Sequence, residues 1–196
     1  MTYSTIQPPF TLKFREMPKR ELRLYFEWFL NVIPQRVSEL AGVVRDTQGF
    51  EDWQPDGTPS SLDSLGEWFA NQVETRQRTS DELIEITSRS ALSFPVSGEE
   101  LTNRTFSLAM DIGMYLSQVL ARSNESLQWE QPLKDKNVFD YGQPVLVGRG
   151  DLSLNPVHIS VTLAYGLARK TKTGKRLREL YNIWEEKLSK QKNPSS

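Results

Sequence analysis

The chain contains no cysteine, and its one histidine is His158. The absence of cysteine excludes disulfide frameworks, thiolate zinc sites, iron–sulfur clusters and cysteine nucleophiles. With a single histidine, a metal site would have to be built mostly from carboxylates, yet the acidic residues never take the spacing of an EF-hand loop. Glycine loops that bind phosphates or dinucleotides are missing as well. We therefore expect no metal and no cofactor.

Long apolar runs are also lacking. No uninterrupted apolar stretch approaches the roughly 18 residues that a membrane span needs, and the start has no basic segment followed by an apolar run. Neither sign of charge dominates, because 24 Lys and Arg residues stand against 25 Asp and Glu residues. This balance gives no global attraction to nucleic acid or to an anionic membrane. We expect a soluble, cytoplasmic protein without a membrane role.

The length of 196 residues is that of one ordinary domain. We expect a single domain over residues 1–196, with an extended N-terminal segment over 1–17 and a frayed tail over 191–196. Five long segments have helical periodicity, whereas only two short runs resemble strands. The predicted fold class is mainly α, a single helical domain with one small antiparallel β-hairpin packed on it.

Two helices are predicted in the first part of the chain. Residues 17–44 have apolar side chains at helical spacing, but Pro34 lies inside the segment and should kink or restart the helix there. A second helix is expected over 62–73, with Thr58 or Ser61 as its cap.

The remaining short elements follow from local patterns. Helical patterns of different strength occupy residues 80–86, 155–168 and 173–191. In the middle one, Asn155 is expected to cap the helix and Pro156 to take its first position. The hairpin is expected to pair residues 127–131 with 141–148 across the turn "PLKDKN".

The stretch "SGEEL" resembles a capping box, in which Ser97 and Glu100 would exchange hydrogen bonds and start a helix from about Gly98 to Arg122. Apolar residues cover nearly its whole circumference, so we expect this helix to be the most buried in the protein. One narrow polar stripe remains, formed by Arg104, Ser107, Asp111, Gln118 and Arg122, with Tyr115 at its margin.

Asp111 is the carboxylate of that stripe, and its role is either structural or functional. Its nearest helical partners are Ser107 and Tyr115, whose hydroxyls suit a carboxylate. It could serve in a solvated edge or helix–helix contact, or it could line a working groove. In the structural case, Asp111→Asn should cost no more than roughly 1–2 kcal/mol. Gly113, beside it, would permit close approach of another helix.

An enzyme hypothesis would centre on Asp111, Tyr115, Glu130 and Asp140, and it requires that these groups converge in one pocket. His158 has no nucleophile or orienting acid near it in sequence, so we interpret it as structural and assign no catalytic residue.

The run "RKTKTGKRLR" at 169–178 is the strongest local charge feature. It could bind the phosphates of a nucleic acid. A solvated turn explains it better, because acidic residues follow it and no aromatic residue interleaves the cations.

Three stretches together carry a resemblance: "YFEWFLNVIPQRVSEL", "SSLDSLGEWF", and "DIGMYLSQVL" followed by "LQW", "QPVLVG" and "LNP". In this order they resemble a loose group of small uncharacterised bacterial cytoplasmic proteins, some of which look like immunity proteins of polymorphic toxins. The resemblance implies a helical fold with a small hairpin and a protein partner, and it carries no catalytic residues over to this chain.

The leading hypothesis is therefore a non-enzymatic bacterial interaction protein, immunity-like, that binds and blocks a partner protein. Such binding needs exposed aromatic anchors. The candidates are Trp53 in its polar loop and Trp129 and Tyr141 around the hairpin. The carboxylate- and tyrosine-based enzyme and the nucleic-acid binder stay open as alternatives.

Overall fold

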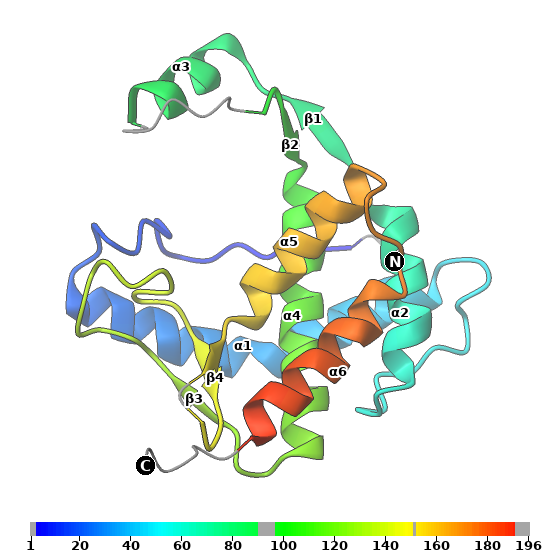
Figure 1. Ribbon diagram of the computed structural model, residues 1–196. Coiled ribbons are helices and arrows are strands. Elements are labelled where there is room, and N and C mark those ends of the chain that lie inside the picture. The colour runs from blue at the N-terminus through cyan, green and yellow to red at the C-terminus, as the bar shows by residue number, and fades with distance from the viewer. Residues whose placement is uncertain (1–2, 90–96, 151, 191–196) are drawn as a thin grey trace.

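The computed structural model describes residues 3–89, 97–150 and 152–190, which form six helices and five short strands (Figure 1). The helices are α1 (Lys19–Arg45), α2 (Ser61–Gln72), α3 (Ser80–Arg89), α4 (Asn103–Ser123), α5 (Pro156–Ala168) and α6 (Arg176–Ser189). The strands are β1 (Thr75–Gln77), β2 (Glu99–Leu101), β3 (Gln128–Glu130), β4 (Val145–Val147) and β5 (Ser153–Leu154). The mainly helical class is confirmed. The predicted frayed tail over 191–196 lies outside the described residues.

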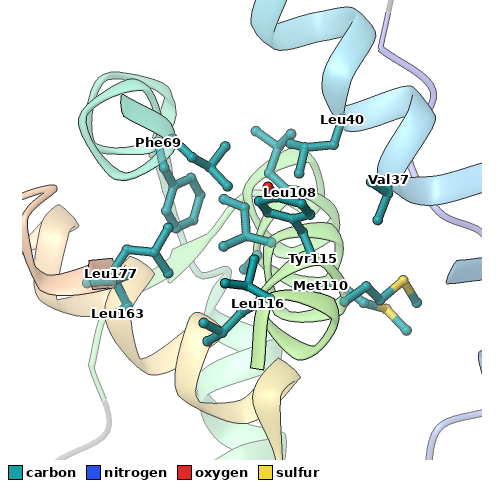
Figure 2. Close-up of a cluster of buried hydrophobic side chains, with 14 of the residues drawn as sticks. Val37, Leu40, Phe69, Leu108, Met110, Tyr115, Leu116, Leu163 and Leu177 are labelled. Carbon is teal, nitrogen blue, oxygen red and sulfur yellow. The ribbon is translucent and has the colours of Figure 1, made fainter. Parts of the chain in front are cut away.

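Helix α4 is the centre of the molecule, and α1 and α5 cross it (Figure 1). It has more buried residues than any other described helix, as its apolar circumference predicted. Figure 2 shows side chains from four other helices around it. They come from α1 (Val37, Leu40), α2 (Phe69), α5 (Leu163) and α6 (Leu177).

Helix α1 continues unbroken through Pro34, so the expected restart is wrong. Pro34 is exposed, whereas Ile33 and Val37 beside it are buried. The buried side of α1 packs on α4, and this packing outweighs the one helical hydrogen bond that a proline cannot donate. The preceding residues 3–17 contain neither helix nor strand.

The predicted capping box at 97–100 is wrong. Residues 99–101 form strand β2, where Glu100 pairs with Arg76 at 2.5 Å instead of capping a helix. Helix α4 begins later, and its cap is Thr102, whose hydroxyl accepts from the Thr105 amide at 3.2 Å. Competition from strand pairing therefore shifted the start of the helix by about one turn.

A capping box does exist, at the start of α3. The Thr79 amide donates to Glu82 Oε2 at 2.8 Å, and the Glu82 amide donates to Thr79 Oγ1 at 3.3 Å. This is the reciprocal exchange that the motif requires. The expected helical turn over 80–86 is consequently a helix of 10 residues.

The predicted cap of α2 is wrong, and the predicted cap of α5 is confirmed. Neither Thr58 nor Ser61 caps α2: Ser60 takes the position without a side-chain hydrogen bond, and Ser61 is the first helical residue. Asn155 caps α5 as predicted, because its side chain accepts from the His158 amide at 3.0 Å and Pro156 follows it.

Gly113 lets α5 approach α4 closely, as expected. A Cβ atom at this position would lie 2.7 Å from the carbonyl oxygen of Pro156 and 2.8 Å from the Cα atom of Val157. Both neighbours are backbone atoms that cannot rotate away, so the packing of the two helices depends on the glycine.

Two small antiparallel sheets complete the fold, one more than the single hairpin predicted. The expected pair of strands is present, with Trp129 opposite Leu146, and β5 adds a third strand to it. The second sheet pairs β1 with β2. Together with α3, these two strands form a projection that we call the α3 arm, residues 74–89 and 97–101, which extends away from the other helices (Figure 1).

No helix within the described residues is long and apolar enough to cross a membrane.

Candidate interaction surface

Asp111 lies in a buried ion pair that joins α4 to α1. Arg36 donates from Nε to Asp111 Oδ1 at 2.8 Å and from one terminal nitrogen to Oδ2 at 2.7 Å. Both side chains are buried, with Asp111 fully inaccessible. The two parallel hydrogen bonds are the strongest geometry available to an arginine and a carboxylate.

Residues of the N-terminal segment contact this ion pair and hydrogen-bond to it. The Tyr3 hydroxyl donates to Asp111 Oδ2 and lies 2.8 Å from Ser107 Oγ and 2.9 Å from a guanidinium nitrogen of Arg36. The Ile6 amide donates to Ser107 Oγ at 2.7 Å. The polar groups of Asp111, Arg36, Ser107 and Tyr3 therefore satisfy one another.

Burial and pairing shift the pKa values of this network in opposing ways. Burial raises the pKa of the Asp111 carboxyl, and the hydrogen bonds and charge of Arg36 oppose that rise. Burial, together with the adjacent Asp111 charge, raises the pKa of Tyr3, so its hydroxyl keeps its proton. Burial acts to lower the pKa of Arg36, but Asp111 outweighs it and the net direction is upward. The carboxylate is thus stable in this site only as the partner of Arg36.

The predicted partners of Asp111 are half right. Ser107 belongs to the network, but through Tyr3. Tyr115 does not, because its hydroxyl lies 2.6 Å from Ser61 Oγ and accepts from the Gly57 amide at 3.0 Å. Burial raises the pKa of the Tyr115 hydroxyl. Asp111 and Tyr115 therefore belong to two separate hydrogen-bond networks.

The aromatic candidates Trp53 and Trp129 both contact the core. The Trp53 ring is buried, stands edge-on to Tyr115 and donates from Nε1 to the Ser61 carbonyl at 2.9 Å. Trp129 is half-buried and stands edge-on to Phe29. Neither ring is an exposed aromatic anchor of the kind that partner binding needs.

The candidates near the hairpin are likewise dispersed. Glu130 is exposed on β3, and Asp140 accepts from the Asn155 side chain at 2.9 Å. Tyr141 is 1% exposed, and its buried hydroxyl has no hydrogen-bond partner among the described residues. The four groups of the enzyme hypothesis have separate surroundings and form no shared cluster.

A different aromatic residue is exposed beside Tyr141. Phe139 is 66% accessible, and Val138 and Leu12 are 45% and 40% accessible. His158, at the start of α5, stands edge-on to the Phe139 ring with 4.8 Å between centroids. We call the surface formed by Val138, Phe139 and His158, with the cleft beside it, the Phe139 face.

The cleft of the Phe139 face has a volume of about 320 Å³. Residues 13–16 of the N-terminal segment line one wall, and Phe139, Tyr141 and Gln143 line the other. Two reciprocal hydrogen bonds hold the walls together: Arg15 donates to the Lys136 carbonyl and Lys136 donates to the Arg15 carbonyl, each at 3.1 Å. The face is consequently a braced surface at the junction of two segments that are far apart in sequence.

The two segments that contain the Arg15–Lys136 hydrogen bonds are basic. Segments 13–23 and 134–140 together carry seven Lys and Arg residues and four carboxylates, a local excess of three positive charges in a chain whose net charge is −1. A partner with acidic groups around an apolar contact would complement it.

Sequence reasoning missed Phe139, although a signal was present. The pair Val138–Phe139 is apolar inside the polar run "KDKNVFDYG". A large aromatic residue in a polar loop either packs into the core or is exposed for contact with another molecule. Tyr141 takes the buried position in this loop, and Phe139 is the exposed residue.

The basic run over 169–178 is partly engaged within the fold. Arg176 pairs with Glu179 at 2.8 Å, Arg178 pairs with Asp63 at 3.4 Å, and Arg169 lies over the Tyr165 ring. Over the described ranges, no three His, Asp or Glu residues gather in an arrangement that could hold a metal ion.

Comparison of the chain with family models, with curated proteins and with solved structures finds no match in any of the three, so its function must be argued from this geometry.

Proposed function

We propose that the protein is a non-enzymatic protein-interaction module and that the Phe139 face is its binding surface. In the immunity-like form that the sequence resemblance implies, binding would cover or distort the active surface of a bacterial partner protein. The candidate anchors from the sequence are replaced by Phe139, which lies next to one of them, Tyr141.

The observation that carries the proposal is the exposure of Phe139 at a braced position. Its ring is 66% accessible but is held by His158, and its loop is tied to the N-terminal segment by Arg15 and Lys136. Aromatic side chains that are rigid before binding lose little entropy when a partner covers them. Such residues often dominate the free energy of an interface.

The alternatives have weaker support. The carboxyl groups of Asp111 and Asp140 are occupied by Arg36 and Asn155, so the enzyme hypothesis has no cluster of carboxylates on which to build. The nucleic-acid hypothesis relies on a run in which Arg176 and Arg178 already have acidic partners.

The test is a comparison of Phe139→Asp with the wild-type protein as baits in lysate from the source organism. A true partner is a different protein that is enriched by the wild type and lost with Phe139→Asp. It must also bind the purified wild-type protein in calorimetry. The matched control is Leu152→Asp, which places the same charge at another exposed apolar residue, 51% accessible and outside the cleft.

We expect the control to retain the partner and Phe139→Asp to bind at least about tenfold more weakly, which corresponds to 1.4 kcal/mol. Both substitutions are on the surface, so both variants should remain folded and unfold in a cooperative thermal transition. A partner that binds both variants equally well would refute the assignment of this surface.

A further inference from the structure

We infer that a second copy of this chain occupies the Phe139 face and that the segment it inserts is the α3 arm. The inference goes beyond the proposed function: it assigns a second occupant, another copy of this chain, to the same surface, and this copy would compete there with a different protein. In the resulting dimer, each molecule would place its arm on the face of the other.

The first argument is that α3 exposes two large apolar side chains. Ile84 is 66% exposed and Ile86 is 37% exposed, although both lie in a helix. The helix has 10 residues, and isolated helices shorter than about 12–15 residues are marginal in water. Burial of these side chains in a contact with another molecule would supply the missing stability.

The arm is nonetheless held in a defined shape at its base. Arg76 donates to both carboxylate oxygens of Glu82, at 2.9 and 2.7 Å, and to Glu100 at 2.5 Å. These bonds connect β1, α3 and β2, while β2 contacts the start of α4. The arm therefore presents its isoleucines from a fixed base.

The second argument is complementarity of charge. Residues 74–101 carry six carboxylates and three arginines, a net charge of −3. The two segments around the Phe139 face carry a net charge of +3. Each surface also has exposed apolar residues at its centre, namely Ile84 and Ile86 on the arm and Phe139 on the face. Opposite fields with matching apolar centres favour association of the two surfaces.

The third argument is the placement of the two surfaces. In the view of Figure 1, the α3 arm lies above the N-terminal segment and the loop between β3 and β4, on the same side of α4. Two molecules related by a two-fold axis would bring each arm opposite the other molecule's face, which makes two identical contacts.

The experiment measures mass in solution by light scattering during size exclusion. The wild type should form a dimer, twice 22.6 kDa, at concentrations up to about 100 µM, where an interface of ordinary size associates. The dimer should weaken as salt concentration rises, since screening reduces the attraction between the charged surfaces. Leu152→Asp again serves as the control and should remain dimeric.

Complementation tests the exchange of arms. An arm variant, Ile84→Asp with Ile86→Asp, and a face variant, Phe139→Asp, should each be monomeric alone. When they are mixed, the intact arm of the face variant can still bind the intact face of the arm variant. Heterodimers should therefore form, with a fluorescence transfer signal between labelled variants that neither variant gives by itself.

A monomeric wild type at all of these concentrations would overturn the inference, and so would a dimer that both variants retain. A mixture without heterodimers would also overturn it, because arm and face would then not be the two halves of one contact. None of these results affects the proposed function, which depends on the loss of a different protein from the Phe139→Asp bait.

Discussion

At the scale of residues, the Asp111 carboxylate is the only neutralising charge within hydrogen-bond distance of the Arg36 guanidinium among the described residues. Arg36 is 5% exposed, so Asp111→Asn would leave a buried positive charge without compensation. Breaking a buried ion pair in this way costs about 3–5 kcal/mol. We expect a loss of that size in the free energy of unfolding, measured by urea denaturation, and thus a larger effect than the sequence alone predicted.

The control for this prediction removes both charges. Replacing Asp111 by leucine and Arg36 by methionine leaves no uncompensated ion, and apolar replacements of buried pairs are often close to neutral. The double variant should therefore be more stable than Asp111→Asn. A loss below about 1 kcal/mol in Asp111→Asn would show that water or Tyr3 compensates for the missing carboxylate.

The identity of Asp111's partner could not be predicted from its own helix. Arg36 is 75 positions away in sequence, and helical spacing reports only neighbours on the same element. A signal did exist on α1, because Arg36 lies three residues after Ile33 and four before Leu40, among the core positions. A cation on an apolar stripe requires a buried anion. Asp111 on the most apolar predicted helix was the matching candidate.

At the scale of elements, the contact of α4 with α5 should be sensitive to a single methyl group. Gly113→Ala would push a Cβ atom to within 2.9 Å of three backbone atoms of Pro156 and Val157. Overpacking of this kind costs about 1–3 kcal/mol. We expect the thermal transition to fall accordingly in calorimetry.

Gly42→Ala is the matched control, because Gly42 lies inside α1 and a Cβ atom there would meet nothing within 4 Å. Alanine is the better helix former by about 1 kcal/mol, so this variant should be equally or more stable than the wild type. Equal destabilisation by both substitutions would contradict the packing role of Gly113.

The start of α3 should respond to acid. Hydrogen bonds from Arg76 and from the Thr79 amide lower the pKa of Glu82 to about 2. A carboxyl whose pKa is lower in the folded state stabilises the fold above its unfolded value, and this stabilisation is lost as pH falls through the folded value. We expect α3 to loosen between about pH 4.5 and 2, observed by NMR titration of Glu82. A midpoint near 4.5 would show that the capping box is not maintained in solution.

The helices were predicted best where apolar residues recur at helical spacing, because those residues pack in the core. The five long helical segments were located, since their apolar stripes report the core directly. The α3 capping box was missed because "TSDE" and "SGEE" carry the same local pattern. Only the pairing of β1 with β2, which is non-local, decides between them. The Phe139 face was missed for a related reason, because exposure depends on which neighbouring segments cover a loop.

At the scale of the whole molecule, stability should be unevenly distributed. Helix α4 is packed by four other helices, whereas the exposed isoleucines of α3 leave it with little buried surface. Amides of α4 should exchange with solvent only through global unfolding, and amides of α3 through local opening at a lower free energy. The hydrogen exchange should be measured on the Phe139→Asp variant, because this variant is expected to be monomeric and a dimer contact then cannot protect the amides of α3. Equal protection of the two helices there would contradict this distribution.

The contact between Tyr3 and Asp111 also determines the order of events during synthesis. The two residues are 108 positions apart, so at 5–20 residues per second a ribosome adds Asp111 roughly 5–20 s after Tyr3. Throughout that interval Arg36 has been made but its counter-ion has not, and α1 has no helix on which to bury its apolar side. Tyr3 therefore cannot reach its native contacts before α4 has been made.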